Sequence, residues 1–182
     1  MGLDISYHSN LKFLGPPPPE KDRGDEFYDD LYDNNQVLLE VDTGYPSYPE
    51  GLEPGIYQVG DESHSFRAGS YSGYGYWREL LCRFSDLAPD PVLVWDDPDQ
   101  YRGRPFQELV NFSDCEGWIG PVVAAKLAKD FQEQEVKIKI RVGKAVEIGE
   151  MEDAEAQYFM ERYQSWKTAC EVAAVAGVIE FH

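Results

Sequence analysis

The segment FRAGSYSGYGYWR, residues 66–78, has the residue types needed to bind an anion beside a flat ring. Glycines allow the backbone to approach a ligand closely and to adopt positive φ angles. A helix that begins here presents unpaired N–H groups at the positive end of its dipole. Arginines bracket the turn, Ser70 or Ser72 can cap the helix, and tyrosines can stack on a base or a sugar. The segment therefore predicts a phosphate-binding turn made of Arg67, Gly69, Ser70, Tyr71, Ser72, Gly73, Tyr74 and Arg78.

A purely structural role for this segment stays open. The segment lacks both the GK[ST] sequence of a P-loop and the GxGxxG spacing of a dinucleotide-binding turn. In this alternative, residues 69–75 form a tight turn, and Tyr71, Tyr74 and Trp77 pack in the core. The two hypotheses differ in whether the arginines are available to a ligand.

A second motif, NFSDCEGWIGP at residues 111–121, also joins an expected strand to an expected helix start. Ser113 and Glu116 have the spacing of a capping box. Asp114 and Glu116 could bind ligand hydroxyls, amines or a cation. We therefore add Ser113, Asp114 and Glu116 to the candidate binding residues, with a cap next to a packed turn as the structural alternative.

Cys115 makes an enzyme the third functional hypothesis. In a first helical turn the dipole lowers the pKa of a thiol, although the neighbouring carboxylates oppose this effect. With His64 or His182 as the base, Cys115 could act as the nucleophile of a hydrolase. No family-specific cysteine signature surrounds it, and cysteine is commonly a small buried hydrophobe.

Metal and cofactor motifs are not apparent in the sequence. The acidic turn WDDPD, residues 95–99, lacks the spacing of a calcium-binding loop and favours a solvated turn. Three cysteines without a CxxC pair indicate neither zinc nor a disulfide framework. We expect no metal and no cofactor, and reduced thiols in the cytoplasm. The N-terminus lacks the features of a secretory signal, and no apolar run is long enough for a membrane span.

The net charge of −18 argues against direct binding of nucleic acid, because such affinity depends on neutralising phosphates. Residues 1–60 hold twelve acids and three bases. The acidic surface could serve solubility, or it could dock on a basic partner such as a nucleic-acid-binding protein. Residues 24–123 contain no lysine, and their five arginines suit bidentate recognition of phosphate or carboxylate: Arg67, Arg78, Arg83, Arg102 and Arg104.

The elements that must position these motifs alternate irregularly along the chain. Apolar alternation predicts strands at residues 2–7, 36–41, 56–60 and 63–69, and PVLVW (91–95) and the end of PFQELVNF (105–112) are also strand-like. The proline and acidic residues at about 15–35 predict an extended loop. Residues 43–55 are rich in turn formers. The terminal segment 177–182 predicts a last strand, preceded by Gly177 as a helix C-cap.

Helical spacing predicts three helices. The first covers residues 72–84, and the second begins either at Ser113 or after Gly120 and runs through VVAAKLAKDFQEQ. VKIKIRV (136–142) alternates like a strand but could extend that helix. The third covers residues 151–175 with Ala154, Tyr158, Tyr163, Trp166 and Cys170 on its inner face. Together these elements predict a single α+β domain over residues 1–182, with a small, mainly antiparallel sheet and about three helices.

Four quoted blocks together resemble a family of small uncharacterised proteins of bacteria, phages and prophages. These blocks are MGLDIS, FRAGSYSGY followed by WR, NFSDCEG-x-IGPVVAAKLAKDF, and RYQSW…GVIEFH. The resemblance spans most of the chain and is weakest in the proline-acidic segment and in residues 132–150. It implies a phage or mobile-element setting, with a counter-defence or host-takeover role in the host cytoplasm. It brings no activity and no catalytic residue with it.

Three functional hypotheses follow. The first is a protein that recognises or sequesters a nucleotide-like or otherwise phosphorylated small molecule. The second is an acidic inhibitor that docks on a basic host protein, as a nucleic-acid mimic of the anti-CRISPR type would, through the aromatic acidic segment 25–33. The third is a hydrolase that uses Cys115 or the neighbouring carboxylates. The first predicts a concave pocket in which Arg67 or Arg78 meets the second motif.

Overall fold

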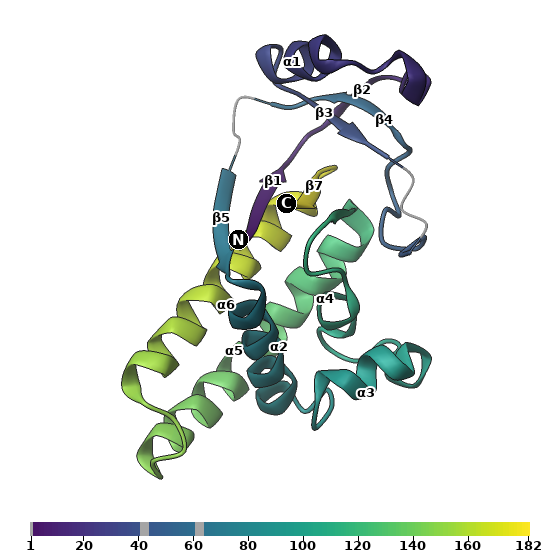
Figure 1. Cartoon of the computed structure of the whole chain (residues 1–182). Coiled ribbons are helices and arrows are strands. Elements are labelled where there is room, and N and C mark those ends of the chain that lie inside the picture. The colour runs from purple at the N-terminus through teal and green to yellow at the C-terminus, as the bar shows by residue number, and fades with distance from the viewer. Residues whose placement is uncertain (1, 41–43, 61–63) are drawn as a thin grey trace.

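The computed structural model describes residues 2–40, 44–60 and 64–182. Within these residues the chain forms an α+β domain with six α-helices and two antiparallel sheets (Figure 1). The predicted fold class is therefore confirmed, but the predicted number of helices, about three, was too low. The end of the strand expected at 36–41 and the starts of the segments at 43–55 and 63–69 lie outside the described residues.

The larger sheet joins both ends of the described chain. Its strands lie in the order β5 (His64–Gly69), β1 (Leu3–His8), β7 (Val178–Phe181) and β6 (Gly117–Ile119), and all neighbours are antiparallel. The alternation of β1 is the reason it forms: Leu3, Ile5 and Tyr7 are buried, and the intervening residues face the other side. The first and last predicted strands are thus confirmed, and they pair antiparallel.

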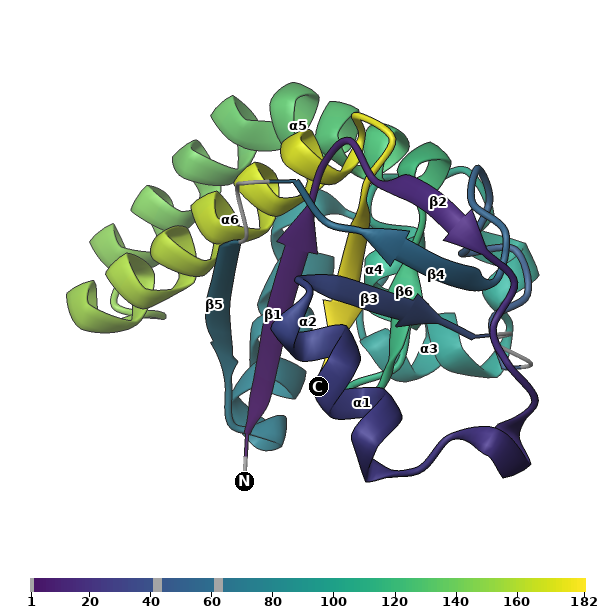
Figure 2. The same cartoon turned by 90° about the horizontal axis from the view of Figure 1, so that it is seen from above.

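The long helices cover the apolar face of this sheet (Figure 2). They are α2 (Tyr71–Ser85), α5 (Pro121–Glu147) and α6 (Asp153–Ala173). Trp166 of α6 is completely buried and stacks against Tyr74 and Trp77 of α2, with ring centroids 5.7 and 6.1 Å away. This aromatic layer forms the centre of the core.

The opposite face of the larger sheet is partly covered by the smaller one (Figure 1). Its strands lie in the order β2 (Lys12–Gly15), β4 (Gly55–Gln58) and β3 (Gln36–Leu39). A small cluster joins the two sheets, and it consists of Leu39, Tyr57, Trp118 and Val178. The predicted strands at 36–41 and 56–60 are therefore observed in this second sheet.

The proline and acidic segment is not the continuous loop expected for residues 15–35. After the prolines it forms the 3-10 helix η1 (Glu20–Asp22) and the helix α1 (Asp25–Asp33). Acidic residues in the first turn of α1 interact favourably with the helix dipole. Leu31 is buried, and Phe27 lies one turn before it on the same side. Two apolar residues at helical spacing were thus enough to fold the segment against β3.

The strands expected within residues 91–95 and at the end of 105–112 are also wrong, because both segments form short helices. They are α3 (Pro91–Asp96) and α4 (Gln107–Asn111), with the 3-10 helix η2 (Pro98–Tyr101) between them. The Asp90 side chain accepts a hydrogen bond from Val92 N at 2.8 Å and caps α3, and Pro91 suits its first turn. The cap and the proline outweigh the β-propensity of the valines.

The second predicted helix begins after Gly120 rather than at Ser113, and residues 136–142 continue it as part of α5. Ile138 and Val142, four residues apart, are buried, whereas Val136 and Ile140 are 69% and 66% exposed. The alternation of VKIKIRV is therefore not used as a strand, since only the residues at helical spacing face the core.

The last helix and its end differ from the prediction in detail. Tyr163, Trp166 and Cys170 are buried as expected, but Phe159 replaces Tyr158 and Ala154 on the inner face. The left-handed residue after α6 is Ala176, with φ 46°, and not Gly177. Gly177 is required for another reason: a Cβ there would lie 1.9 Å from the His8 carbonyl oxygen.

Candidate functional site

The topology of the larger sheet brings both motifs to one end of it. β1 and β6 begin at this end, and β5 and β7 end there. Arg67 on β5 lies opposite Asp4 on β1, whose backbone exchanges hydrogen bonds with that of His182 at 3.0 and 3.2 Å. Glu116 directly precedes β6 on the far side of β7. β5 continues into α2, and residues 111–116 lead into β6, so the two motifs lie at the same end of the sheet, next to its two opposite edge strands.

The first motif forms the expected strand-to-helix junction. Ser70 caps α2, because its Oγ accepts a hydrogen bond from Gly73 N at 3.0 Å. Ser72 Oγ lies 3.2 Å from Ser70 Oγ. Gly69 has a φ of 134°, and a Cβ on it would lie 2.9 Å from the Tyr158 hydroxyl oxygen. Ser70 is therefore the N-cap, and Tyr158 covers the glycine turn.

The two arginines of this motif do not hold one anion together. Arg67 is exposed and forms an ion pair with Asp4, with 3.4 Å between Nη1 and Oδ2. Arg78 is buried and lies about 12 Å along α2 from the cap, at 1.5 Å per residue. Tyr74 is also buried, and burial raises its pKa. The core alternative is thus right for Tyr74 and Trp77, whereas Tyr71 is exposed.

Arg78 instead meets the second motif. Its Nη1 donates to the carbonyl oxygens of Val110 and Phe112 at 3.3 and 3.1 Å. Its Nη2 lies 3.6 Å from Asp114 Oδ2, which is longer than an ordinary hydrogen bond. Among the described residues, its buried Nε has no hydrogen-bond partner.

The guanidinium of Arg78 also lies between two aromatic rings. Its central carbon is 4.6 Å from the ring centroid of Tyr74 and 5.0 Å from that of Trp95. Arg78 is only 4% exposed, and a buried charge is costly unless it is both paired and hydrogen-bonded. Asp114 is the carboxylate beside it, and about half of that side chain is exposed. Arg78 is therefore a buried cation that is incompletely neutralised.

A cavity of about 350 Å³ opens onto Arg78, and we call it the Arg78 pocket. Its volume is at the small end of the range for small-molecule sites. Trp95 Nε1 donates to Val110 O at 2.8 Å, which fixes the indole beside the guanidinium. The lining residues are Tyr45, Arg78, Trp95, Asn111, Phe112, Ser113 and Asp114.

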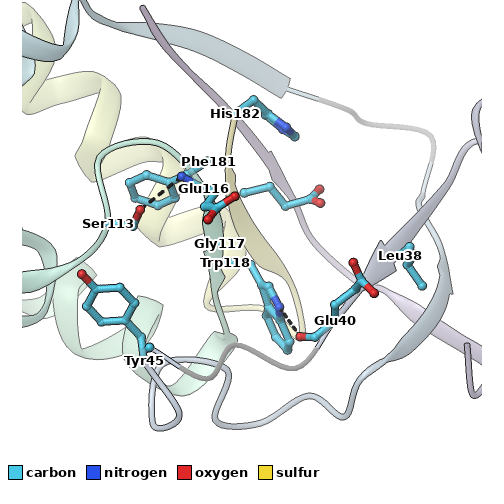
Figure 3. Close-up of a pocket in the computed structure, with 11 residues that line it drawn as sticks. Leu38, Glu40, Tyr45, Ser113, Glu116, Gly117, Trp118, Phe181 and His182 are labelled. Carbon is cyan, nitrogen blue, oxygen red and sulfur yellow. Dashed lines mark hydrogen bonds between the residues drawn. The ribbon is translucent and has the colours of Figure 1, made fainter. Parts of the chain in front are cut away.

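A second cavity, of about 580 Å³, lies between the two sheets, and we call it the acidic pocket (Figure 3). Glu40 follows β3, Glu116 precedes β6 and Glu180 belongs to β7. Trp118 Nε1 donates to Glu40 O at 2.9 Å. Figure 3 shows Glu40 and Glu116 on different sides of the cavity. Its other lining residues are Leu38, Gly44, Tyr45, Ser113, Gly117, Trp118, Phe181 and His182.

Ser113 shapes the loop between the two cavities instead of capping a helix. Its Oγ accepts hydrogen bonds from the backbone N–H groups of Cys115 and Glu116 at 3.3 and 3.2 Å. The capping-box spacing therefore identified the correct hydrogen bond, but β6 follows the turn and no helix begins there.

Sequence reasoning missed Tyr45, Trp95, Glu40 and Glu180. Glu40 and Tyr45 are close in sequence, but Trp95 and Glu180 are far from them, and only the packing of the two sheets and the short helices brings all four to the motifs. Glu180 did carry a signal, since it is the one charged residue within the apolar strand VIEF.

Among the described residues, no hydrogen bond joins Cys115 to either histidine. The side chain of Cys115 is exposed, and its Sγ lies 3.5 Å from Ser113 Oγ. His64 is on the opposite edge strand and stacks on Tyr7 at 5.2 Å. His182 lines the acidic pocket, whose lining does not include Cys115 among the described residues.

The three thiols should differ strongly in reactivity. Burial raises the pKa of the Cys82 thiol to about 12 and also raises that of Cys170, whereas Cys115 is exposed. We expect a disulfide-exchange reagent to modify Cys115 alone in the folded protein, and all three thiols in denaturant. Cys115→Ser is the control and should remove the native reaction. Fast native modification of a second thiol would contradict the burial of Cys82 and Cys170.

Metal binding finds no support in the described part of the chain, which contains no group of three or more histidine, cysteine or carboxylate side chains arranged to hold an ion. The acidic turn at 95–99 has local structural roles. Asp97 accepts from Gln100 N and caps η2, and Asp99 pairs with Arg102.

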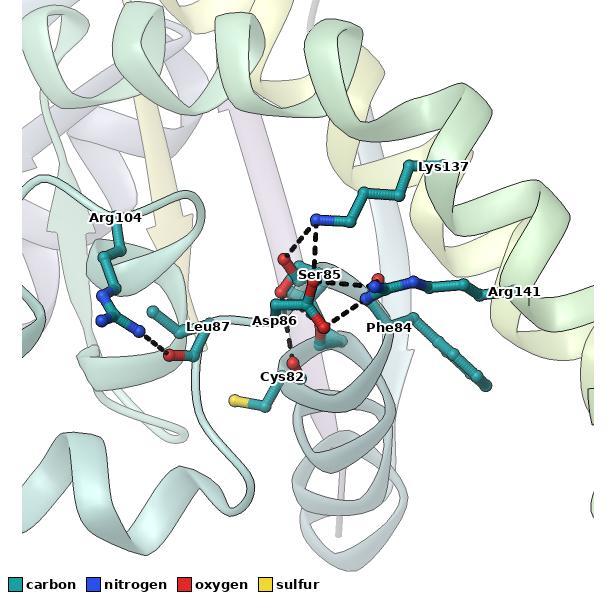
Figure 4. Close-up of polar contacts among 9 residues, drawn as sticks. Cys82, Phe84, Ser85, Asp86, Leu87, Arg104, Lys137 and Arg141 are labelled. Atoms are coloured by element: carbon teal, nitrogen blue, oxygen red, sulfur yellow. Dashed lines mark hydrogen bonds and ion pairs between the residues drawn. The ribbon is translucent and has the colours of Figure 1, made fainter.

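Another charged cluster, at the end of α2, is structural (Figure 4). Asp86 ends the helix with a left-handed φ of 62°. Its carboxylate accepts hydrogen bonds from Arg141 and lies 3.1 Å from Lys137 Nζ, which ties α2 to α5. These partners, Arg141 first, lower the pKa of Asp86 to about 2.

Replacing Asp86 by asparagine should reduce stability in a pH-dependent way. Asparagine tolerates the left-handed conformation, so the change removes mainly the charge. Because the folded-state pKa is below the unfolded value, the contribution is present above about pH 4 and is lost as the pH falls toward about 2. The side chain is 59% exposed, so we expect about 1 kcal/mol or less near neutrality.

Urea unfolding of Asp86→Asn and of the parent chain, from neutral to acidic pH, measures this difference. Asp99→Asn is the matched control, since its ion pair with Arg102 is local and exposed. A difference for Asp86→Asn that stays constant on acidification would rule out the ion pair as its cause.

Comparison with protein-family models, with curated proteins and with solved structures gave no match. In the part of the chain that the structure describes, no helix is both long and apolar enough to cross a bilayer.

Proposed function

We propose that this protein binds a small molecule that carries a phosphate or carboxylate on a planar ring, and that the Arg78 pocket holds it. One observation carries the proposal: Arg78, which is only 4% exposed, lines a cavity, and the oxygen of its carboxylate partner Asp114 is 3.6 Å away. An anionic ligand would complete the neutralisation of this buried charge.

The other lining groups fit the remainder of such a ligand. Trp95 is 41% exposed and offers a ring face next to the cation, and Tyr45 lines the same cavity. Asp114 and Asn111 offer polar atoms for ligand hydroxyls or amines. A nucleotide-like ligand combines all these features, so recognition or sequestration of such a molecule is the role we favour over catalysis.

A fluorescence titration tests the proposal directly. Among the four tryptophans only Trp95 is substantially exposed, because Trp77, Trp118 and Trp166 are 5% exposed or less. We expect phenyl phosphate and adenosine monophosphate to change the emission of Trp95 in a saturable way. Trp95→Phe keeps an aromatic ring and should lose the signal while binding persists by calorimetry. If neither compound binds by either method, the proposal fails.

A second candidate function, docking on a basic protein, is favoured by the outer face of α1. Residues at helical spacing form one exposed face there, and Tyr32 is 86% exposed. Carboxylates with tyrosine rings between them suit arginine and lysine side chains. The face consists of Asp25, Tyr28, Asp29, Tyr32 and Asp33.

Binding of an oligo-arginine peptide at several salt concentrations tests this second function. Neutralising Asp29 and Asp33 together should weaken binding strongly, and Tyr32→Ala should weaken it further. The control neutralises Glu133 and Glu147 on α5, which changes the net charge equally at a distant place. Equal losses in the two double variants would leave only a general charge effect and would exclude a specific face.

A further inference from the structure

We infer that the ligand of the Arg78 pocket also carries a positively charged group, which reaches the acidic pocket. This inference rests on the proposed function and adds the chemical class of the ligand: a dipolar molecule with an anion, a planar ring and an ammonium or guanidinium group.

The two cavities adjoin one another. Tyr45 and Ser113 line both of them. The loop that Ser113 shapes places Asp114 in the lining of one cavity and Glu116 in the lining of the other. A ligand held at Arg78 can therefore extend past Tyr45 without leaving the protein surface.

The charges of the two cavities are opposite. The Arg78 pocket contains a buried guanidinium whose Nε has no partner among the described residues. Three glutamates line the acidic pocket, and neither lysine nor arginine is among its described lining residues. The adjoining cavities thus form an electrical dipole, and a ligand with the opposite dipole would satisfy both ends.

Glu116 is the carboxylate best placed to receive the cation. Glu40 already forms an ion pair with Arg23, and Glu180 Oε2 lies 3.3 Å from His8 Nε2. Within the described residues no ion pair engages Glu116. Its loop is also the one that carries Asp114, so it lies next to the Arg78 pocket. Tyr45, which is half-buried and lines this cavity, offers an aromatic ring of the kind to which organic cations bind well.

Two probes that differ by one aminoethyl group test the inference. Phenyl phosphate supplies the ring and the anion, and tyramine O-phosphate adds an ammonium group on a two-carbon arm. We expect tyramine O-phosphate to bind about tenfold more tightly in calorimetry, because a charged hydrogen bond is added. Glu116→Gln should bring the ratio of the two affinities, measured with both probes on the variant, close to one.

The control is Glu147→Gln, which alters the net charge equally at the exposed end of α5 and should preserve the advantage. Equal affinities of the two probes for the parent chain, with both binding, would overturn the inference and leave the proposed function intact. An advantage that survives Glu116→Gln undiminished would overturn the assignment of Glu116. If neither probe binds, the proposed function and the inference both fail.

Discussion

Replacing Arg78 by lysine is expected to weaken the binding of phenyl phosphate by about tenfold or more, which corresponds to about 1.4 kcal/mol or more. Lysine keeps the positive charge but loses the planar fork that spans the carbonyl oxygens of Val110 and Phe112 and still faces the cavity. A single ammonium group cannot serve both carbonyls and a ligand in the same geometry. Calorimetry on the parent chain and the variant measures the loss.

Arg67→Lys is the matched control, because Arg67 belongs to the same motif but is exposed and paired with Asp4. We expect it to leave the affinity unchanged. Arg78→Lys should also lower the free energy of unfolding by about 1–3 kcal/mol, since a buried carbonyl loses its donor, and urea unfolding verifies that the variant is folded under the conditions of the titration. Equal losses in the two variants would mean that the anion does not bind at Arg78.

Gly177→Ala is expected to have the largest effect on stability, a loss of about 3 kcal/mol. The new Cβ would lie 1.9 Å from the His8 carbonyl oxygen, which belongs to the backbone of β1 and cannot rotate away. His8 lies opposite Val178, so the strands β1 and β7 must separate at the point where their pairing begins. Urea unfolding of the variant and the parent chain measures the loss.

Gly143→Ala is expected to change the stability of the same protein in the opposite direction. Gly143 lies within α5, and a Cβ on it would meet no atom within 4 Å other than those of its own helical turns. Alanine there should raise the free energy of unfolding by about 0.5–1 kcal/mol, because glycine is a poor helix former. If Gly177→Ala proved as well tolerated as Gly143→Ala, the close approach of residue 177 to β1 would be wrong.

The parts of the fold that the sequence predicted are those with long, clear periodicity or a cap. β1, β7 and α2 are examples; for the N-cap of α2 the sequence offered Ser70 or Ser72, and the structure selects Ser70. The errors lie in short segments, such as 91–95 and 105–112, where β-branched residues favour strands but an N-cap, a proline and tertiary packing select helices. α1 was missed because only Leu31 and its neighbour Phe27 distinguish it from an acidic loop.

The candidate site was predicted in part. The sequence indicated that Arg78 or Arg67 would meet the second motif, and Arg78 does lie beside Asp114. It could not indicate which arginine, because helical rise carries Arg78 away from the turn while Arg67 stays on the sheet. Trp95 and Glu180 could not be assigned to the site, since their positions depend on how separate segments pack.

The most direct test of the central claim is the nuclear magnetic resonance signal of the Arg78 Nε–H group in the protein with isotope-labelled arginine. The chain has eight arginines, and the signal that disappears in Arg78→Lys identifies Arg78. On titration with phenyl phosphate we predict that this signal shifts progressively to saturation, while that of Arg67 does not move. Saturable binding that leaves the Arg78 signal in place, or no binding at all, would contradict the account.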